Sequence, residues 1–242
     1  MQETPSSEPP RLPPTLDYES ARTHTRDDLA YFLPMGVFLA FTWAGAHWAS
    51  FYVASYVLKT LLTSTLLVFF WRSYTKINWN YWWLGILMGV VGVVQWVGME
   101  KTLLHLWPNY PHISGDVFVP TTSFASPIRM WSFIAIRWAG AAMVVPVMEE
   151  LFWRDFLWRS IAAPADFKLA RIGEWDRGIP LLIVTLLFCS VHVEWMTAIV
   201  WGSMVGGLLV YTRSLGACIL MHAVTNLLLG AYVVYRHDWA FW

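Results

Sequence analysis

The fold is decided by residues 130–161, which read MWSFIAIRWAGAAMVVPVMEELFWRDFLWRSI. This stretch is apolar along most of its length, and it exceeds the roughly 20 residues that a helix needs to cross about 30 Å of hydrocarbon. Glu149, Glu150 and Arg154 nevertheless lie inside it. A charge at the centre of a membrane helix costs about 2.5–3.5 kcal/mol on insertion scales, so such residues mark functional sites by default. The stretch therefore predicts a membrane-spanning helix that carries a polar site.

Six further apolar segments accompany this one, at about 30–48, 51–71, 81–99, 180–194, 196–212 and 215–235. Backbone polar groups must be satisfied within the chain when lipid surrounds them, so these segments are predicted to be helices. The segments at 180–194 and 196–212 are short and nearly contiguous, which indicates either a tight helical hairpin or one broken helix. The sequence predicts an all-α polytopic membrane protein with about seven to eight transmembrane helices.

The composition agrees with a membrane protein. Of the 242 residues, 57% are hydrophobic and only 13% are charged, whereas soluble domains carry about 25% charged residues. The mean hydropathy is +0.47. The 17 Trp residues favour membrane–water boundaries, where amphipathic rings collect. The formal net charge is zero, so nothing indicates a nucleic-acid partner. Cys189 and Cys218 lie in apolar segments without zinc-ligand spacing and are interpreted as buried thiols.

Three regions are predicted along the chain. Residues 1–28 are polar and Pro-rich and are interpreted as a disordered tail. Residues 29–128 hold N-terminal membrane helices and an external loop at about 101–127, and residues 129–242 hold the remaining helices. With seven spans, the segments on the N-terminal side hold most basic residues, namely Arg11, Arg22, Arg26, Arg72, Lys76, Arg159, Lys168, Arg171, Arg177 and Arg213; the other side holds Lys101, Arg129 and Arg236. This asymmetry predicts a cytoplasmic N-terminus and an external C-terminus. An eighth span would reverse the second statement.

Three of the predicted helices bring polar groups to a similar depth. At about 1.5 Å per residue, Glu149 lies about 18 Å from the inner end of its segment. His192 lies about 18 Å from the start of its own segment, and His222 and Asn226 lie about 10 and about 16 Å from the start of theirs. These polar residues are therefore expected to meet near the middle of the membrane.

The spacing within each helix assigns partners. Glu150 and Arg154 are four residues apart, so they share a helix face and can pair. Glu149 is rotated by about 100° from Glu150, which makes it the freer carboxylate. His222 and Asn226 also share a face.

A carboxylate and a neutral imidazole can together hold and deprotonate a water molecule, and a second His with an Asn can donate hydrogen bonds to an oxyanion. These groups fit the hydrolysis of an acyl bond, most simply a peptide bond. Glu and His also suit a divalent metal such as zinc, although the sequence contains no HExxH motif.

Other polar residues in the apolar segments have structural interpretations. Lys59 and Arg137 have no partner at a suggestive spacing and are interpreted as snorkelling or interhelical contacts. Glu194 follows His192 by two residues and is expected on the opposite side of the helix. Gly202 and Gly206 form a GxxxG pattern that favours helix packing. Taken singly, the candidate His and Asn residues also fit interhelical hydrogen bonds, so the functional hypothesis depends on the combination.

The combination resembles a known family. Glu149-Glu-Leu-Phe-Trp-Arg154 is similar to the EExxxR motif of the CPBP (CAAX protease and bacteriocin-processing) intramembrane proteases, which are related to the Rce-type prenyl-protein endopeptidases. Phe188-Cys-Ser-Val-His192 is similar to their FxxxH motif, and His222-Ala-Val-Thr-Asn226 to their HxxxN motif. The motifs follow the family's order and cover about 145–235. The resemblance implies a four-helix catalytic core within residues 129–242.

The resemblance also implies roles. Glu149 would activate water beside His192, His222 and Asn226 would stabilise the oxyanion, and Glu150 and Arg154 would support them. The family has been described both as metalloproteases and as metal-free glutamate proteases. A divalent metal held by Glu149, His192 and His222 therefore stays open, as does the absence of any cofactor.

The expected activity is intramembrane endopeptidase cleavage of a membrane-anchored protein or peptide, in the lipid bilayer of a bacterial inner membrane. The closing run from Arg213 and the terminal Trp-Ala-Phe-Trp are similar to a bacterial subgroup associated with exosortases. One alternative is a non-catalytic assembly or immunity factor of the same fold. Another is a small-solute transporter, because broken helices and intramembrane carboxylates also occur in transporters.

Overall fold

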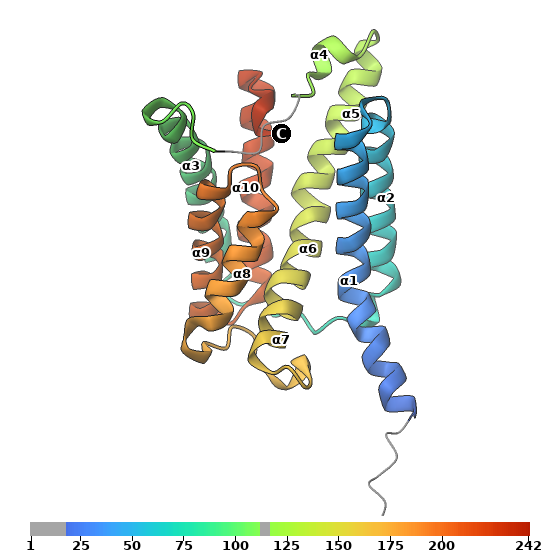
Figure 1. The fold of residues 1–242 in the computed structure, drawn as a ribbon, viewed down its shortest axis with the longest axis vertical. Helices are drawn as coiled ribbons and strands as arrows, with labels where there is room; N and C mark the ends of the chain where they lie inside the picture. Colours follow the sequence, from blue (N-terminus) through green and yellow to red (C-terminus); the bar gives the residue numbers. More distant parts are fainter. Residues whose placement is uncertain (1–17, 112–116) are drawn as a thin grey trace, which may run out of the picture.

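The computed structural model describes residues 18–111 and 117–242 (Figure 1). Within these residues the chain forms helices and no strand, which confirms the all-α prediction. The ten α-helices are α1 (Tyr18–His47), α2 (Tyr52–Phe69), α3 (Trp82–Leu106), α4 (Pro120–Ser123), α5 (Pro127–Ala139), α6 (Val145–Glu150), α7 (Trp158–Ala162), α8 (Ile179–Ser190), α9 (Trp195–Thr212) and α10 (Leu215–Arg236). Helix α1 begins well before the predicted segment 30–48 and inside the predicted disordered tail at 1–28. Residues 1–17 of that tail lie outside the described residues.

Residues Pro127–Ala162 are helical throughout and include α5, α6 and α7. Two π-helical stretches, Gly140–Val144 and Leu151–Leu157, join these three α-helices. The first stretch ends two residues before Pro146, whose ring has no N–H to donate and crowds the carbonyl four residues earlier, that of Ala142 within the stretch. A wider turn relieves that crowding. The short α6 between the two stretches contains Glu149 and Glu150. Single π-helical turns occur frequently at functional sites, so the local geometry already distinguishes this part of the helix.

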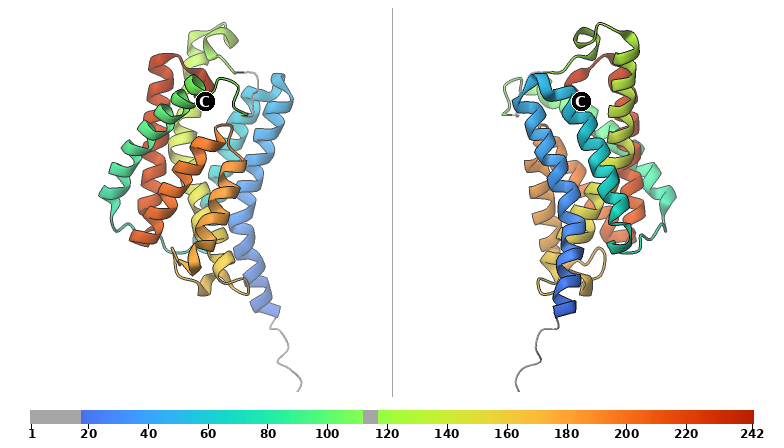
Figure 2. Two further views of the ribbon diagram at one scale, coloured as in Figure 1. Left: turned by 60° about the vertical axis from the view of Figure 1, so that its left-hand side comes forward. Right: turned by 90° about the vertical axis from the view of Figure 1, so that its right-hand side faces the viewer.

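Six helices in the described part of the chain are long and apolar enough to cross a membrane. Every predicted apolar segment contains a helix, but the segment at 180–194 is helical only to Ser190, and its helix α8 has 12 residues, too few to cross alone. Of the two forms predicted for residues 180–212, the tight hairpin is present, since α8 and α9 lie side by side (Figures 1 and 2). The tip of this hairpin lies below the upper end of α10 in Figure 1. The protein is thus polytopic, with six candidate spans and one partial one.

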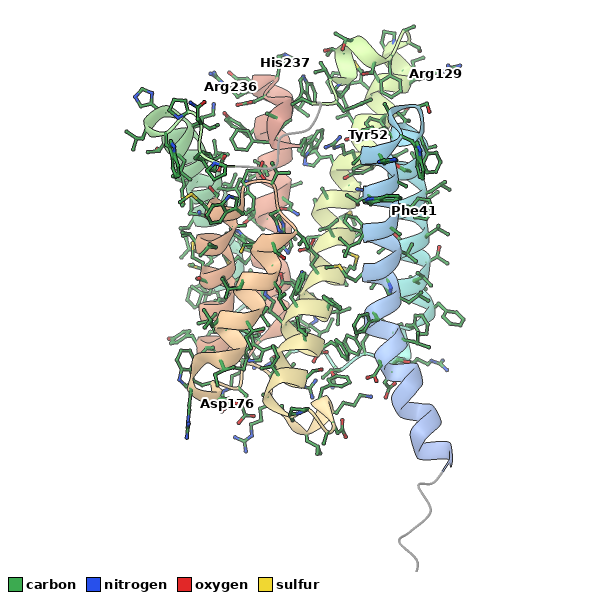
Figure 3. The ribbon with its side chains drawn as sticks, in the orientation of Figure 1. Phe41, Tyr52, Arg129, Asp176, Arg236 and His237 are labelled. Atoms are coloured by element: carbon green, nitrogen blue, oxygen red, sulfur yellow. The ribbon has the colours of Figure 1, made fainter. Side chains whose placement is uncertain are left out.

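Charged and aromatic residues mark the two ends of the helix bundle. Figure 3 places Asp176 at one end and Arg129 and Arg236 at the other. The exposed Trp residues lie near helix ends, with Trp43, Trp48, Trp107 and Trp131 at the upper end and Trp71, Trp79, Trp82, Trp83 and Trp175 at the lower end. Two such belts match the aromatic girdles of membrane proteins, and their placement supports a bundle that crosses the bilayer along its long axis.

Small residues allow the closest helix contacts. A Cβ at Gly85 of α3 would lie 2.4 Å from the backbone oxygen of Ala217 in α10, so these two helices touch backbone to backbone. In the hairpin, a Cβ at Gly206 would lie 2.3 Å from Leu181 and one at Gly202 would lie 3.3 Å from Phe188. The predicted packing role of Gly202 and Gly206 is therefore confirmed, and close packing of this kind holds membrane helices together.

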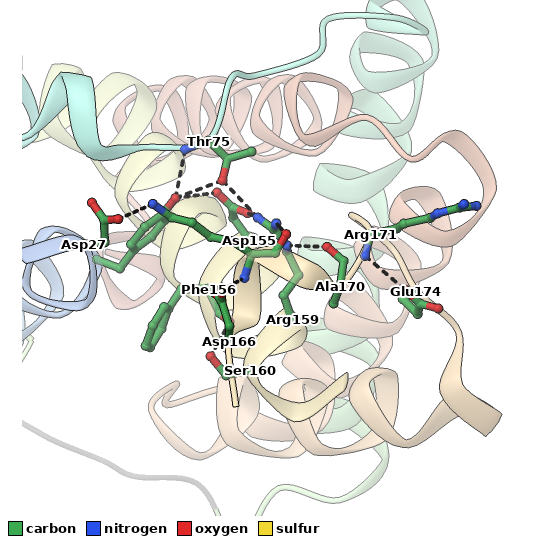
Figure 4. Close-up of polar contacts among 12 residues, drawn as sticks. Asp27, Thr75, Asp155, Phe156, Arg159, Ser160, Asp166, Ala170, Arg171 and Glu174 are labelled. Carbon is green, nitrogen blue, oxygen red and sulfur yellow. Dashed lines mark hydrogen bonds and ion pairs between the residues drawn. The ribbon is translucent and has the colours of Figure 1, made fainter. Parts of the chain in front are cut away.

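A polar network at the lower end joins three parts of the chain (Figure 4). Asp155 is fully buried, accepts a hydrogen bond of 2.8 Å from the Tyr31 hydroxyl and forms an ion pair with Arg159. Arg159 also donates to the Thr75 hydroxyl and to the carbonyl of Ala170. Because these partners come from α1, the connection between α2 and α3, and the connection that follows α7, the network fixes the lower end of the bundle. The sequence reasoning did not single out Asp155.

Candidate active site

A cavity of about 290 Å³ lies between the helices, and all four predicted catalytic residues line it: Glu149, His192, His222 and Asn226. They come from α6, from the connection between α8 and α9, and from α10. The four side chains therefore line one cavity, as the comparison of their depths predicted, although they lie far apart in the sequence. Aromatic rings of Trp96, Phe188 and Trp201 complete this part of the wall.

Glu149 is buried, with 7% of its surface exposed. Its Oε2 atom has no hydrogen-bond partner within the described residues. A buried carboxylate oxygen without a donor is costly, and such a group is expected to bind a water molecule or a substrate group. Of the two adjacent glutamates, only Glu149 lines the cavity, which agrees with its angular position on the helix.

Glu150 is committed to other side chains. It is fully buried, and its Oε1 atom accepts hydrogen bonds from Nη1 of Arg154 at 3.1 Å and from Nδ1 of His222 at 2.9 Å. The predicted pair of Glu150 and Arg154 is confirmed, whereas the bond to His222 was not predicted. The Arg154 guanidinium also lies over the Phe188 ring at 4.8 Å. Glu150 therefore ties α6 to α10 at the level of the cavity.

The position of His192 is fixed by Phe188, four residues earlier. Its Nδ1 atom lies 2.7 Å from the carbonyl oxygen of Phe188, and its ring packs on the Phe188 ring with centroids 4.2 Å apart. A carbonyl can only accept a hydrogen bond, so Nδ1 carries the proton. In the neutral ring Nε2 is then an acceptor. The Phe188–His192 spacing thus fixes both the orientation and the tautomer of the imidazole.

His222 and Asn226 are held from α10. The Nδ1 atom of His222 donates to the Glu150 carboxylate, which leaves Nε2 as an acceptor in the neutral ring. The His222 ring packs edge-on against Trp201, with centroids 4.8 Å apart. Asn226 donates from Nδ2 to the carbonyl of Ala141 at 2.8 Å, inside the first π-helical stretch. One amide hydrogen of Asn226 remains for a further acceptor.

The arrangement does not fit the metal site that the donor types allowed. Within residues 27–111 and 117–242, no three His, Cys, Asp or Glu side chains are close enough to hold one metal ion. Glu149, His192 and His222 share a cavity but are not gathered around one point. Zinc needs three or four ligands at about 2.0–2.3 Å, so these side chains as placed do not form such a centre.

Three charged residues that were given structural interpretations also line the cavity: Lys59, Arg137 and Glu194. Helix α8 ends at Ser190, so the helical angle expected between His192 and Glu194 does not apply. Of the two interpretations given to Lys59 and Arg137, the interhelical contact is present and snorkelling is not. Both side chains are buried, at 7% and 6% exposure, and they donate to Thr42 of α1 and Tyr52 of α2. Because a positive charge within a membrane helix is costly, Lys59 and Arg137 could have been recognised from the sequence as candidates for the cavity lining.

Two further buried polar groups were missed. Glu100 of α3 accepts a hydrogen bond of 2.8 Å from the Thr197 hydroxyl and another from the Tyr110 hydroxyl. Tyr110 lies outside the helices, and burial together with the hydrogen bond to Glu100 raises the pKa of its hydroxyl. These contacts fasten α3 and its following loop to the start of α9, next to the connection that carries His192. Cys189 and Cys218 are buried free thiols, as predicted.

Comparison with known proteins identifies the region that contains the site. Residues 131–228 match the family model Rce1-like, described as type II CAAX prenyl endopeptidase Rce1-like. The matched region runs from α5 into α10 and includes all three motifs. Comparisons with curated proteins and with solved structures give no match.

Proposed function

Residues 131–228 belong to the Rce1-like family of type II CAAX prenyl endopeptidases, and from this we propose that the protein is an intramembrane endopeptidase. Its substrate is a membrane-anchored protein or peptide, and the reaction is hydrolysis of one peptide bond. The family is a protease family, and the six helices suited to a membrane support a substrate that is itself held in the bilayer.

Glu149 and His192 hold the attacking water. The Glu149 carboxylate accepts one hydrogen bond from the water, and Nε2 of His192 accepts the other. Attack on the scissile carbonyl forms the new C–O bond while one water proton passes to the Glu149 carboxylate. The feature that supports this role most directly is the Oε2 atom of Glu149, which is buried, unpartnered among the described residues and part of the cavity wall.

Asn226 and His222 face the oxyanion that attack creates. Asn226 contributes the amide hydrogen that Ala141 does not use. His222 donates to the oxyanion from Nε2 in the form in which both ring nitrogens carry a proton, with Nδ1 facing the Glu150 carboxylate. Preorganised donors of this kind stabilise developing negative charge strongly in water-poor sites. His222 thus acts with Glu150 as a unit.

The second half of the reaction returns the proton. As the tetrahedral intermediate collapses, the C–N bond breaks and the proton held by Glu149 moves to the leaving amine nitrogen. The second water proton passes from the new carboxyl group to the amine, so the products are a carboxylate and an ammonium group, and Glu149 is again ionised. Glu149 therefore serves as base and then as acid, and no group outside the chain is required for the proton balance.

The test uses purified protein in proteoliposomes with a lipid-anchored fluorogenic peptide library. The wild type is expected to release cleaved peptide, while His192→Ala and His222→Ala lower kcat/KM at least 100-fold, the scale of one catalytic group. His105→Ala is the matched control. His105 is exposed and lies outside the cavity lining, so this variant is expected to retain wild-type activity.

Other outcomes would contradict the proposal. Absence of cleavage by the wild type, together with full complementation of a gene deletion by the His192 and His222 variants, would indicate a non-catalytic assembly factor. Solute flux into the same liposomes that depends on these residues would indicate a transporter.

A further inference from the structure

Another cavity, of about 410 Å³, lies in the connection between α2 and α3, and the described residues that line it all fall within 71–79. This connection lies near the lower end of the bundle (Figure 1). Arg72 and Lys76 are part of the lining, and both are exposed. The reaction proposed above uses no residue of this cavity.

The two cations of the cavity have no negative partner among the described residues. The sequence contains no acidic residue between Asp28 and Glu100, and no acidic residue belongs to the lining. The ion pairs of the described part of the chain involve neither Arg72 nor Lys76. Two neighbouring cations without an acid create a positive local potential, which attracts an anion.

Contacts from three sides fix the shape of the cavity. The Tyr74 hydroxyl donates to a backbone carbonyl of α1 at 2.9 Å. The Thr75 hydroxyl accepts a hydrogen bond of 2.9 Å from the buried Arg159 (Figure 4). The carbonyl of Asn78 accepts a hydrogen bond of 2.8 Å from the Ser214 hydroxyl, directly before α10. A connection held in this way loses little conformational freedom when a ligand binds.

Two Trp rings indicate the depth of the cavity in the membrane. Trp71 and Trp79 are the first and last residues of the lining, and they are 65% and 49% exposed. Trp79 also packs against α10, because a Cβ at Gly216 would lie 2.6 Å from its ring. Exposed Trp rings of membrane proteins lie at the level of the lipid headgroups. The cavity is therefore at the depth where the phosphate groups of a lipid leaflet lie.

We propose that this cavity binds the phosphate group of an anionic phospholipid through Arg72 and Lys76. Arg can bind a phosphate with two parallel hydrogen bonds, and basic pockets beside membrane helices accept anionic headgroups. The Trp71 and Trp79 rings pack against the glycerol backbone and the adjoining part of the acyl chains, which a free phosphate lacks. The bound lipid fastens the connection between α2 and α3 to the bilayer surface. This inference does not depend on the proposed endopeptidase function.

The test uses protein in phosphatidylcholine nanodiscs that contain a small fraction of phosphatidylglycerol with a photoreactive glycerol headgroup. Cross-linked peptides are identified by mass spectrometry after illumination. In the wild type, the cross-links are expected to concentrate on residues 71–79. Arg72→Gln/Lys76→Gln lowers the yield at this segment about tenfold, because each cation near an anionic lipid contributes to its attraction. Arg72→Lys/Lys76→Arg keeps both charges and most of the yield, which separates loss of charge from loss of structure.

The matched control is Arg171→Gln/Arg177→Gln. It removes two exposed cations at the same end of the bundle, outside the cavity lining, and is expected to keep the full yield. An equal loss in this control would assign the cross-links to general attraction and overturn the proposal. Equal labelling by a photoreactive phosphatidylcholine would show that the segment contacts lipid without selecting an anion, and would also overturn it. Loss of labelling when inorganic phosphate is added at constant ionic strength would assign the cavity to free phosphate instead.

Discussion

Glu150 and His222, which lie 72 residues apart, are joined by a hydrogen bond of 2.9 Å between Oε1 and Nδ1. The same Oε1 atom accepts from Arg154, so one carboxylate oxygen connects the EExxxR helix to α10. The two adjacent glutamates therefore have different environments. Oε1 of Glu150 holds Arg154 and His222 in place, whereas Glu149 lines the cavity and Glu150 does not. The Oε2 atom of each glutamate has no partner among the described residues.

Glu150→Gln is expected to destabilise the fold strongly. Arg154 is 1% exposed, and removal of the carboxylate leaves its charge buried and unpaired, at a cost of about 3–5 kcal/mol. Chemical unfolding in detergent micelles, followed by Trp fluorescence, measures this loss. The double variant Glu150→Gln/Arg154→Met removes both charges and should recover part of it. A single variant as stable as the wild type would show that the pair does not hold the bundle.

Asp155→Asn is expected to lower stability without lowering catalysis. The change removes the negative partner of buried Arg159, at a cost of about 3 kcal/mol or more, and Asp155 is not part of the cavity lining. Asp27→Asn is the matched control, because Asp27 pairs with the more exposed Lys168 and such surface pairs contribute about 0–1 kcal/mol. Unfolding midpoints and cleavage rates at low temperature are both measured. A large loss of cleavage by folded Asp155→Asn protein would contradict a purely structural role.

Gly85→Ala and Gly98→Ala test the contact between α3 and α10. A methyl group at Gly85 would meet a backbone oxygen at 2.4 Å, whereas nothing lies within 4 Å of the corresponding position at Gly98. Overpacking of this kind costs about 1–3 kcal/mol, while Ala in an open helix position costs nothing. Gly85→Ala should therefore lower the free energy of unfolding and Gly98→Ala should not. Equal effects would mean that the two helices are not in backbone contact.

Chelation is expected to leave the activity unchanged. Because no three ligating side chains converge in the part of the chain that the structure describes, treatment with 1,10-phenanthroline should change kcat/KM by less than twofold. Metal content after the treatment is measured by mass spectrometry. Activity that disappears with the metal and returns with added zinc would contradict this expectation.

The helices could be predicted because apolar segments of suitable length are strong signals. The meeting of Glu149, His192 and His222 could also be predicted, since position along a helix gives depth in the membrane. The depth of a residue does not tell which face of its helix points toward a neighbouring helix, however. The hydrogen bond between Glu150 and His222 therefore could not be predicted. Lys59 and Arg137 were expected to snorkel or to make interhelical contacts, and they make interhelical contacts. Their common neighbour Tyr56 becomes evident only when α2 and α5 pack together.

Short-range patterns were missed as well as long-range ones. Asp155 and Arg159 have the same four-residue spacing as Glu150 and Arg154, so their ion pair could have been predicted from the period of a helix. The early start of α1 could not, because the polar composition of residues 18–28 favours disorder. The short α8 also ends before His192, which invalidated the helical angle assigned to Glu194.

Peptide cleavage and unfolding of Glu149→Gln, measured side by side with Glu150→Gln, test the role of the available carboxylate most directly. Gln has nearly the same shape as Glu but cannot take a proton from water. The Glu149 variant is expected to unfold at or above the wild-type midpoint and to lose at least 100-fold in kcat, whereas the Glu150 variant loses stability. A folded Glu149→Gln protein that cleaves the anchored peptide at the wild-type rate would contradict the proposed water activation.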